Sequence, residues 1–284
     1  MKFTSLLIIT LLFNILQAEE NITIIPPQSN SDISHNYFSK ILKESLEDDS
    51  RKVNILHSKE MSQERALIEL KKNRTIDVMW TGTSIKREKD LRAIKIPLLK
   101  GLLGYRVFII NKEDEKKFNK INTIEELKEL RACQGAQWPD TEILEKSGLN
   151  VVRNTNYEAM FLQLSIKRCD YFPRGIYEGY SEVEARKDSY PTLMIYDKVI
   201  LYYPFPMYFF VSKRNEDLAL RIEKGLLKMI DNGNFDTYLK ENSSTKYLYS
   251  TNKWQNRKIF KISNPLLSPL TDITNTKFWI VPKF

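Results

Sequence analysis

The sequence predicts an α/β protein of two units, each a mainly parallel sheet flanked by helices. The order strand, helix, strand, helix, strand occurs twice along the chain, and it is typical of parallel sheets covered by helices. The chain has 284 residues, more than one hydrophobic core usually organises. Hydrophobic residues make up 42% of it and aromatic residues 11%, which is ample for two packed cores.

The first unit runs from residue 22 to residue 80. Short apolar runs predict strands at 22–25, 53–56 and 75–80. Apolar residues at helical spacing predict helices at 33–42 and 62–72 between them.

A long apolar strand, 105–110, leads into the second unit. Thr123 and Glu126 form a capping box that opens a helix over 124–130. The same alternation then predicts strands at 131–134, 151–153 and 169–172 and helices at 140–146 and 157–166.

The last part of the chain predicts strands at 199–203 and 207–211 and an amphipathic helix over 216–230. Gly233 gives that helix a stop signal. After Thr245 the periodicity is lost, so we expect a tail that wraps a lobe.

The N-terminus has the layout of a secretory signal peptide. Lys2 precedes an apolar run over 6–13, and the small residue Ala18 precedes two acidic residues. The run is shorter than the roughly 20 residues that a spanning helix needs. We therefore expect export to the periplasm with cleavage near Ala18.

The chain carries a formal charge of +8 and a pI of about 9.2. Its Lys and Arg residues are interleaved with Glu and Asp along the whole length, which indicates a solvated surface. We expect no nucleic-acid partner, although a bias towards anionic ligands is consistent with the charge.

Several stretches resemble the type II periplasmic solute-binding proteins, the class that includes amino-acid-binding receptors of ABC transporters. TIDVMWTGTSIKRE resembles the end of the third strand in lobe one, and TIEELKEL with ACQGAQW resembles the entry to lobe two. NYEAMFLQLSIKRCDYF and DLALRIEKGLLKMIDNGNFDTYL resemble a later helix with its strand and the closing helix pair. The resemblance covers residues 20 to 240 and depends on the order of the elements.

The resemblance implies two lobes joined by a two-strand hinge, with residues 19–105 and 205–284 in lobe one and 106–204 in lobe two. It implies binding of a small polar, carboxylate-bearing, amino-acid-like solute for ABC-type import. The expected partners are this small molecule and a membrane permease or sensor receptor. We expect a monomer without catalytic residues, metal or cofactor.

Open α/β sheets place ligands outside the carboxyl ends of their strands, so two facing sheets would line one cleft. Arg174 follows the strand at 169–172 and should enter that cleft, where its guanidinium could clamp a carboxylate. Its alternative role is an ion pair with Asp170 or Glu178.

More candidate ligand-binding residues follow other strand ends. After the strand at 131–134 the chain places Trp138, Asp140 and Thr141 at a helix N-terminus, which suits an anion. Opposite them, the end of the strand at 75–80 places Trp80, Thr83 and Ser84. The alternatives are helix capping for Asp140 and Thr141 and core packing for the two tryptophans.

The amino-acid-binding receptors usually carry Thr-x-x-Arg after the third strand. Here Ser84 precedes Arg87 by three residues, and Lys89 competes for the same position. An α-amino acid is therefore one option among several polar solutes.

An enzyme is the first rival function. The two histidines, His35 and His57, lie in no catalytic or metal-binding motif. A mechanism that uses only carboxylates would need Asp140, Glu158 or Glu178 in the cleft.

A sensing module is the second rival, because capture of the same ligand could feed a membrane receptor instead of a permease.

Family strand order would also place Cys133 and Cys169 on neighbouring strands, where a disulfide needs Cα atoms within about 7 Å. Two buried free thiols are the alternative.

Overall fold

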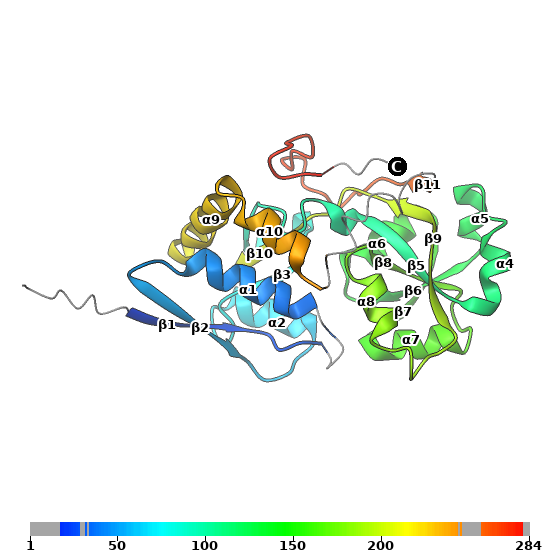
Figure 1. Cartoon of the computed structure of the whole chain (residues 1–284), viewed down its shortest axis with the longest axis horizontal. Coiled ribbons are helices and arrows are strands. Elements are labelled where there is room, and N and C mark those ends of the chain that lie inside the picture. Colours follow the sequence, from blue (N-terminus) through cyan, green and yellow to red (C-terminus); the bar gives the residue numbers. More distant parts are fainter. Residues whose placement is uncertain (1–17, 29–31, 33, 244, 246–256, 281–284) are drawn as a thin grey trace, which may run out of the picture.

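The structure, a computed structural model, describes residues 18–28, 32, 34–243, 245 and 257–280. Figure 1 shows two lobes side by side, with α1, α2, α9 and α10 in one and α4 to α8 in the other. We call them the first and second lobe. The predicted signal peptide lies almost entirely outside the described residues, since only Ala18 is included.

The first lobe contains two small sheets. In one, β1 (Ala18–Ile24) pairs in parallel with β2 (Arg51–His57). In the other, β10 (Met207–Val211) is antiparallel to both β3 (Met79–Gly82) and β4 (Arg92–Ile94). The helices of this lobe are α1 (Ser34–Leu46), α2 (Gln63–Lys71), α3 (Ile85–Asp90), α9 (Glu216–Asp231) and α10 (Asn234–Glu241).

Asp77 connects these two sheets. Its backbone N–H donates to the Thr23 carbonyl at 2.9 Å, and its carboxylate accepts from the Thr23 N–H at 2.8 Å. The chain from Thr75 to Val78 is therefore held beside β1 without forming a regular ladder. For this reason β3 starts four residues later than the sequence predicts.

The second lobe is built on one six-stranded sheet of order β11-β9-β5-β8-β6-β7. The pairs β11·β9, β8·β6 and β6·β7 are parallel, whereas β5 is antiparallel to both of its neighbours. The strands are β5 (Tyr105–Asn111), β6 (Arg131–Gly135), β7 (Asn150–Asn154), β8 (Tyr171–Gly175), β9 (Leu193–Tyr202) and β11 (Lys258–Lys261). The helices are α4 (Glu115–Phe118), α5 (Ile124–Lys128), α6 (Pro139–Lys146), α7 (Tyr157–Ser165) and α8 (Gly179–Glu184).

Two chain segments connect the lobes and run beside each other. The first contains a 3₁₀ turn at Leu102–Gly104 that enters β5, and the second leaves β9 and reaches β10. The Tyr203 N–H donates to the Gly104 carbonyl at 3.2 Å. A Cβ atom at Gly104 would lie 2.1 Å from the Tyr203 carbonyl oxygen, so this close approach requires glycine.

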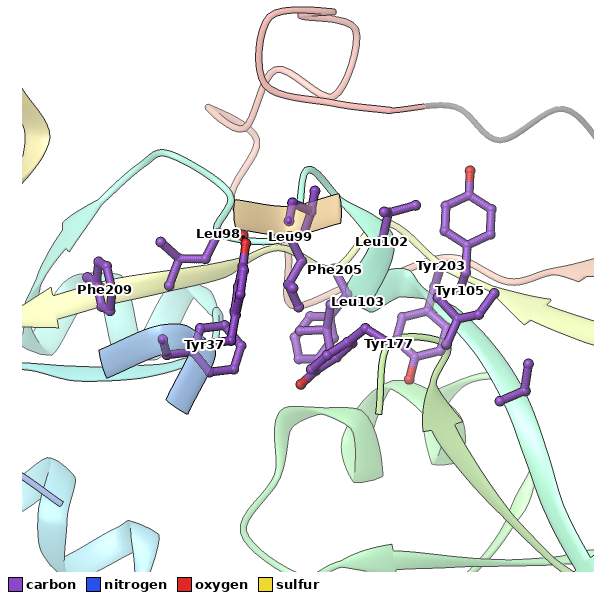
Figure 2. Packing of buried hydrophobic residues seen from close by; sticks show 14 of the residues in the cluster. Tyr37, Leu98, Leu99, Leu102, Leu103, Tyr105, Tyr177, Tyr203, Phe205 and Phe209 are labelled. Carbon is purple, nitrogen blue, oxygen red and sulfur yellow. Dashed lines mark hydrogen bonds between the residues drawn. The ribbon is translucent and has the colours of Figure 1, made fainter. Parts of the chain in front are cut away.

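The hydrophobic core is continuous through these connections. Figure 2 shows Phe209 and Tyr37 of the first lobe in a row with Leu103, Tyr177 and Tyr203. All five side chains are buried. Because this apolar surface belongs to both lobes, it stabilises their junction as well as each lobe.

A disulfide joins Cys133 of β6 to Cys169, which lies two residues before β8. The two Cα atoms are 5.6 Å apart, within the range that a disulfide allows. The bond lies in a buried cluster with Phe161 and Phe172. Of the two alternatives for the cysteines, the structure therefore has the disulfide.

The C-terminal segment touches both lobes. It pairs with β9 through β11, and the Leu266 carbonyl then accepts from the Ile85 N–H at the start of α3. Trp279 packs on Gly101, whose φ of +81° and lack of a side chain allow the contact. Because β11 extends the sheet of the second lobe, this part of 205–284 does not belong to lobe one as the sequence analysis assigned it. The other lobe boundaries stay predictions.

The two-lobed α/β class is confirmed, and so are most predicted elements. The capping box of Thr123 and Glu126 is present, and α9 ends just before Gly233, which has a φ of +82°. One strand differs in a way that matters, since β8 extends to Gly175 instead of ending at Phe172. Among the described residues, no helix is both long and apolar enough to cross a membrane.

Candidate functional site

A small cavity lies between the lobes beside their connections, and we call it the inner cavity. Its volume is about 90 Å³, enough for several water-sized groups. The first lobe contributes Trp80 and His35 to its wall, and the second lobe contributes Trp138, Arg174 and other polar residues. The inner cavity is therefore lined by both lobes.

Arg87 is a buried arginine, with 8% of its surface exposed, whose partners Thr81 and Gly82 line the inner cavity. Its Nη1 donates to Thr81 Oγ1 at 2.6 Å and to the Gly82 carbonyl at 2.7 Å. Its Nη2 donates to Gln63 Oε1 at 2.7 Å and, across the cleft, to the Gln137 carbonyl of the second lobe at 3.2 Å. All four acceptors are uncharged.

Burial lowers the pKa of Arg87 to about 10, while the charge of Asp140 acts in the opposite direction. The guanidinium still carries its charge at neutral pH. A charge held only by neutral acceptors in a buried place would gain from an incoming carboxylate. Lys89, the positional competitor of Arg87, is exposed, so the geometry favours Arg87 as the anion-binding residue.

A larger space of about 600 Å³, the outer cavity, adjoins the inner one. Arg87, Ser84, Thr141 and Arg153 line it, together with apolar side chains of α2. Trp138 and Pro139 line both cavities, so the two spaces share part of their wall. Arg87 is therefore accessible from the outer side of the cleft.

Arg174 lies at the inner cavity but already has partners. Its Nε and Nη2 donate to the two carboxylate oxygens of Glu182 at 2.8 and 2.7 Å, and Nη2 lies 3.0 Å from Glu178 Oε1. Although burial disfavours the charged form, Glu178 and Glu182 raise the pKa of Arg174 well above its ordinary value. The alternative of an ion pair with Glu178 is confirmed, and Asp170 instead pairs with Lys117 and Arg131.

The position of Arg174 also differs from the expectation. It lies within β8, paired with Val107 of β5, because the strand continues past Phe172. Its guanidinium lies 4.8 Å from the ring centre of Trp138. Arg174 thus forms part of the cavity wall, and the carboxylate clamp expected of it would require it to leave two carboxylates.

Asp140 forms a second buried pair. Its Oδ1 accepts from Arg106 Nη2 in a short ion pair and from the Tyr203 hydroxyl at 2.6 Å. Asp140 lies in the first turn of α6, yet the structure gives α6 no side-chain cap. The capping alternative therefore does not describe Asp140. Its carboxylate holds an arginine of the hinge strand at the cavity wall.

Trp80 and Trp138 each pack against core residues and also line the inner cavity. Trp80 stacks on Phe38 with ring centres 5.4 Å apart, and Trp138 lies parallel to Phe172 at 6.2 Å. Both also line the inner cavity. Packing fixes one side of each ring, and the cavity meets another part of it.

The three hydroxyl residues have different places. Thr83 is fully buried, donates to Glu88 at 2.8 Å and lines neither the inner nor the outer cavity, so the structure gives it no place in the site. Ser84 Oγ caps α3 by accepting the Arg87 N–H at 3.2 Å. Thr141 Oγ1 donates to the Gly135 carbonyl at 2.6 Å, which fixes the turn before α6. Ser84 and Thr141 contribute to the outer cavity.

Sequence reasoning missed several polar residues of the inner cavity, among them Asp32, His35, Gln63, Arg106 and Glu182, and it considered Glu178 there only for a carboxylate mechanism. Gln63 opens a helix and Glu182 lies inside one, so neither follows a strand end. Arg106 lies near the start of the strand that leads into the second unit, and so it follows no strand end either. The one available signal was the i,i+4 spacing of Arg174, Glu178 and Glu182, which places the three side chains close together if a helix follows the strand.

No family model and no curated protein sequence matches the chain. Solved structures do. The chain is similar to an ancestral arginine-binding protein bound to arginine (16% identity, TM-score 0.57), covering 98% of that chain with 78% of its own.

Two further structures extend this finding. A binding component of an ABC transporter from Wolinella succinogenes, complexed with lysine, has 13% identity and a TM-score of 0.58, with coverage of 82% of this chain and 99% of that one. An ancestral amino acid-binding protein, a precursor of cyclohexadienyl dehydratase, has 13% identity and a TM-score of 0.54, with coverage of 79% and 94%. The chain therefore has the fold of the type II periplasmic solute-binding proteins.

Proposed function

We propose that the protein binds a small, polar, carboxylate-bearing solute of amino-acid type between its lobes. The proposal rests on the surroundings of Arg87. This arginine is a buried cation, and all of its described hydrogen bonds go to neutral acceptors. Its contact with Gln137 links the anion site to the second lobe, so a ligand bound there would favour the closed arrangement. The arginine and lysine bound to the structurally similar proteins support an amino-acid-like solute.

The solute is then delivered to a membrane permease for ABC-type import from the periplasm. The ABC transporter component among the similar structures and the signal-peptide-like N-terminus support this route. In this role the solute leaves the protein unchanged. Incubation of the purified protein with each solute that binds should therefore give no product by mass spectrometry, and product formation would indicate an enzyme.

A thermal-shift screen of amino acids, polyamines, carboxylates and sugars tests the binding function. At about 100 times its Kd, a true ligand should stabilise the protein by roughly 2.7 kcal/mol and raise the Tm by about 5–10 °C. Among these compounds, carboxylates should give the shift. A screen in which sugars or polyamines bind and no carboxylate does would overturn the proposal.

Arg87→Met tests the role of the anion site. It removes the charge and keeps most of the side-chain volume, so the shift caused by a carboxylate should disappear. Arg131→Met is the matched control, because Arg131 lines neither cavity, is half exposed and pairs with Asp170. An equal shift in wild type and Arg87→Met would exclude Arg87 from the site.

A further inference from the structure

Acidic side chains outnumber basic ones around the inner cavity. Four carboxylates line it, against two guanidinium groups: Asp32, Asp140, Glu178 and Glu182 against Arg106 and Arg174. His35 lines it too, and burial lowers the pKa of His35, so it adds little positive charge at neutral pH. With every carboxylate ionised, these lining side chains have a formal excess of two negative charges.

Both arginines are committed to particular carboxylates. Arg106 Nη2 pairs with Asp140, and Arg174 holds Glu182 through two hydrogen bonds. Glu178 lies beside both of these arginines, with its Oε1 at 3.0 Å from Arg174 Nη2 and 3.6 Å from Arg106 Nη1. It is the third buried carboxylate beside two cations.

Glu178 is 7% exposed, so its charge is largely removed from water. Burial and the neighbouring Glu182 raise the pKa of Glu178, although Arg174 and Arg106 oppose this shift. An ionised carboxylate in such a place is costly unless a further cation compensates it. Aromatic rings of Trp80, Trp138 and Tyr177 complete the wall, and such rings also attract cations.

Arg87, in contrast, lacks a carboxylate partner among the described residues and lines the outer cavity. Trp138 and Pro139 line both this cavity and the acidic inner one. The cleft thus offers a positive charge at the outer cavity and a negative excess at the inner cavity next to it.

We propose that the solute carries, besides the carboxylate held by Arg87, a cationic group that enters the inner cavity and is received by Glu178. The substrate class is that of basic amino acids and related carboxylates with an ammonium or guanidinium group at the far end. This inference rests on the proposed function, since it assigns the second end of the same ligand.

Matched pairs of probes test it on the full mature chain by titration calorimetry. L-Arginine and L-citrulline have nearly the same shape, but only arginine carries a charged side chain, and L-lysine and L-norleucine form a second pair. One charge-assisted contact should make the cationic member bind about 10- to 100-fold more tightly. Equal affinity within both pairs would overturn the inference.

Glu178→Gln tests the residue itself. The amide oxygen can still accept from the Gly175 N–H, which Glu178 Oε1 accepts at 2.9 Å. The variant should lose the preference for arginine over citrulline and keep its affinity for citrulline. Glu184→Gln is the control, since Glu184 lines neither cavity, is 66% exposed and should leave the preference unchanged.

The outcomes separate this inference from the proposed function. Binding of citrulline, norleucine or an acidic amino acid with no advantage for arginine or lysine would overturn the cationic class and leave carboxylate binding intact. Failure of every carboxylate to bind would overturn both. The comparison of arginine with citrulline in the wild type needs no variant, so poor folding of Glu178→Gln would not prevent a decision.

Discussion

Two buried arginines on opposite sides of the cleft, Arg87 and Arg174, are held in opposite ways. Arg174 is surrounded by the carboxylates of Glu178 and Glu182, which raise its pKa despite burial. Arg87 has neutral acceptors, and burial lowers its pKa to about 10. Both are less than a tenth exposed.

The difference distinguishes a charge that the protein's own carboxylates neutralise from a charge that a ligand could neutralise. A buried guanidinium with its own carboxylates is satisfied, and a ligand could bind it only by displacing them. A buried guanidinium with neutral partners has its hydrogen bonds but lacks a counter-charge, which a ligand can supply. Two variants test this comparison, and two pH measurements extend it to the walls of the inner cavity.

The largest effect is expected for Arg174→Met. Removing this guanidinium leaves Glu178 and Glu182 buried beside each other without their main cation, which should cost roughly 3–5 kcal/mol of unfolding free energy. Urea denaturation measures it. Arg153→Met, at a half-exposed ion pair, should cost at most about 1 kcal/mol. A loss at Arg174 no larger than at Arg153 would show that the two carboxylates do not depend on it.

A smaller effect is expected for Gln63→Ala in the first lobe. It removes one neutral acceptor of Arg87 and leaves the Gln137 carbonyl to accept from the same Nη2. One such hydrogen bond contributes about 1 kcal/mol. A loss as large as that of Arg174→Met in the same denaturation experiment would contradict the distinction between the two arginines.

The smallest effect concerns pH and His35, on the first-lobe wall of the inner cavity. Burial lowers the pKa of His35 below its ordinary value of 6.5, against the opposing effects of the Ile25 carbonyl and Asp32. The unfolded chain therefore binds this proton more readily, and stability should fall as pH decreases below about 6.5. His35→Gln should show a smaller decrease in Tm between pH 7.5 and 5.5 than the wild type.

Glu178, on the opposite wall, should change the stability of the protein with pH in the opposite direction. Its pKa is raised from 4.5, so the folded state binds its proton more tightly, and this contribution to stability is lost as pH rises above about 4.5. In the unliganded protein, Glu178→Gln should therefore become more stable relative to the wild type over that range. A Tm difference between the two that does not change with pH would argue against an ionisable Glu178 at this place.

Elements with a strong local signal were predictable from the sequence, whereas short ones were not. Periodicity located α9, and Thr123 with Glu126 marked the start of α5. Helix α3 has only six residues, and its first N–H is held by Leu266, about 180 positions later in the chain. Local sequence patterns do not predict strand β11 either, because it is a strand only through its pairing with β9.

The sequence by itself determined the α/β alternation, the two-lobed class and the arrival of polar and aromatic residues at the ends of strands, because these follow from side-chain periodicity and local capping. The tertiary structure decided which arginine has a carboxylate and which does not. Glu182 reaches Arg174 because α8 folds back over β8, and Arg87 meets Gln137, 50 residues away, only because the lobes come together. Ion pairing depends on distance through space, which a linear pattern does not contain.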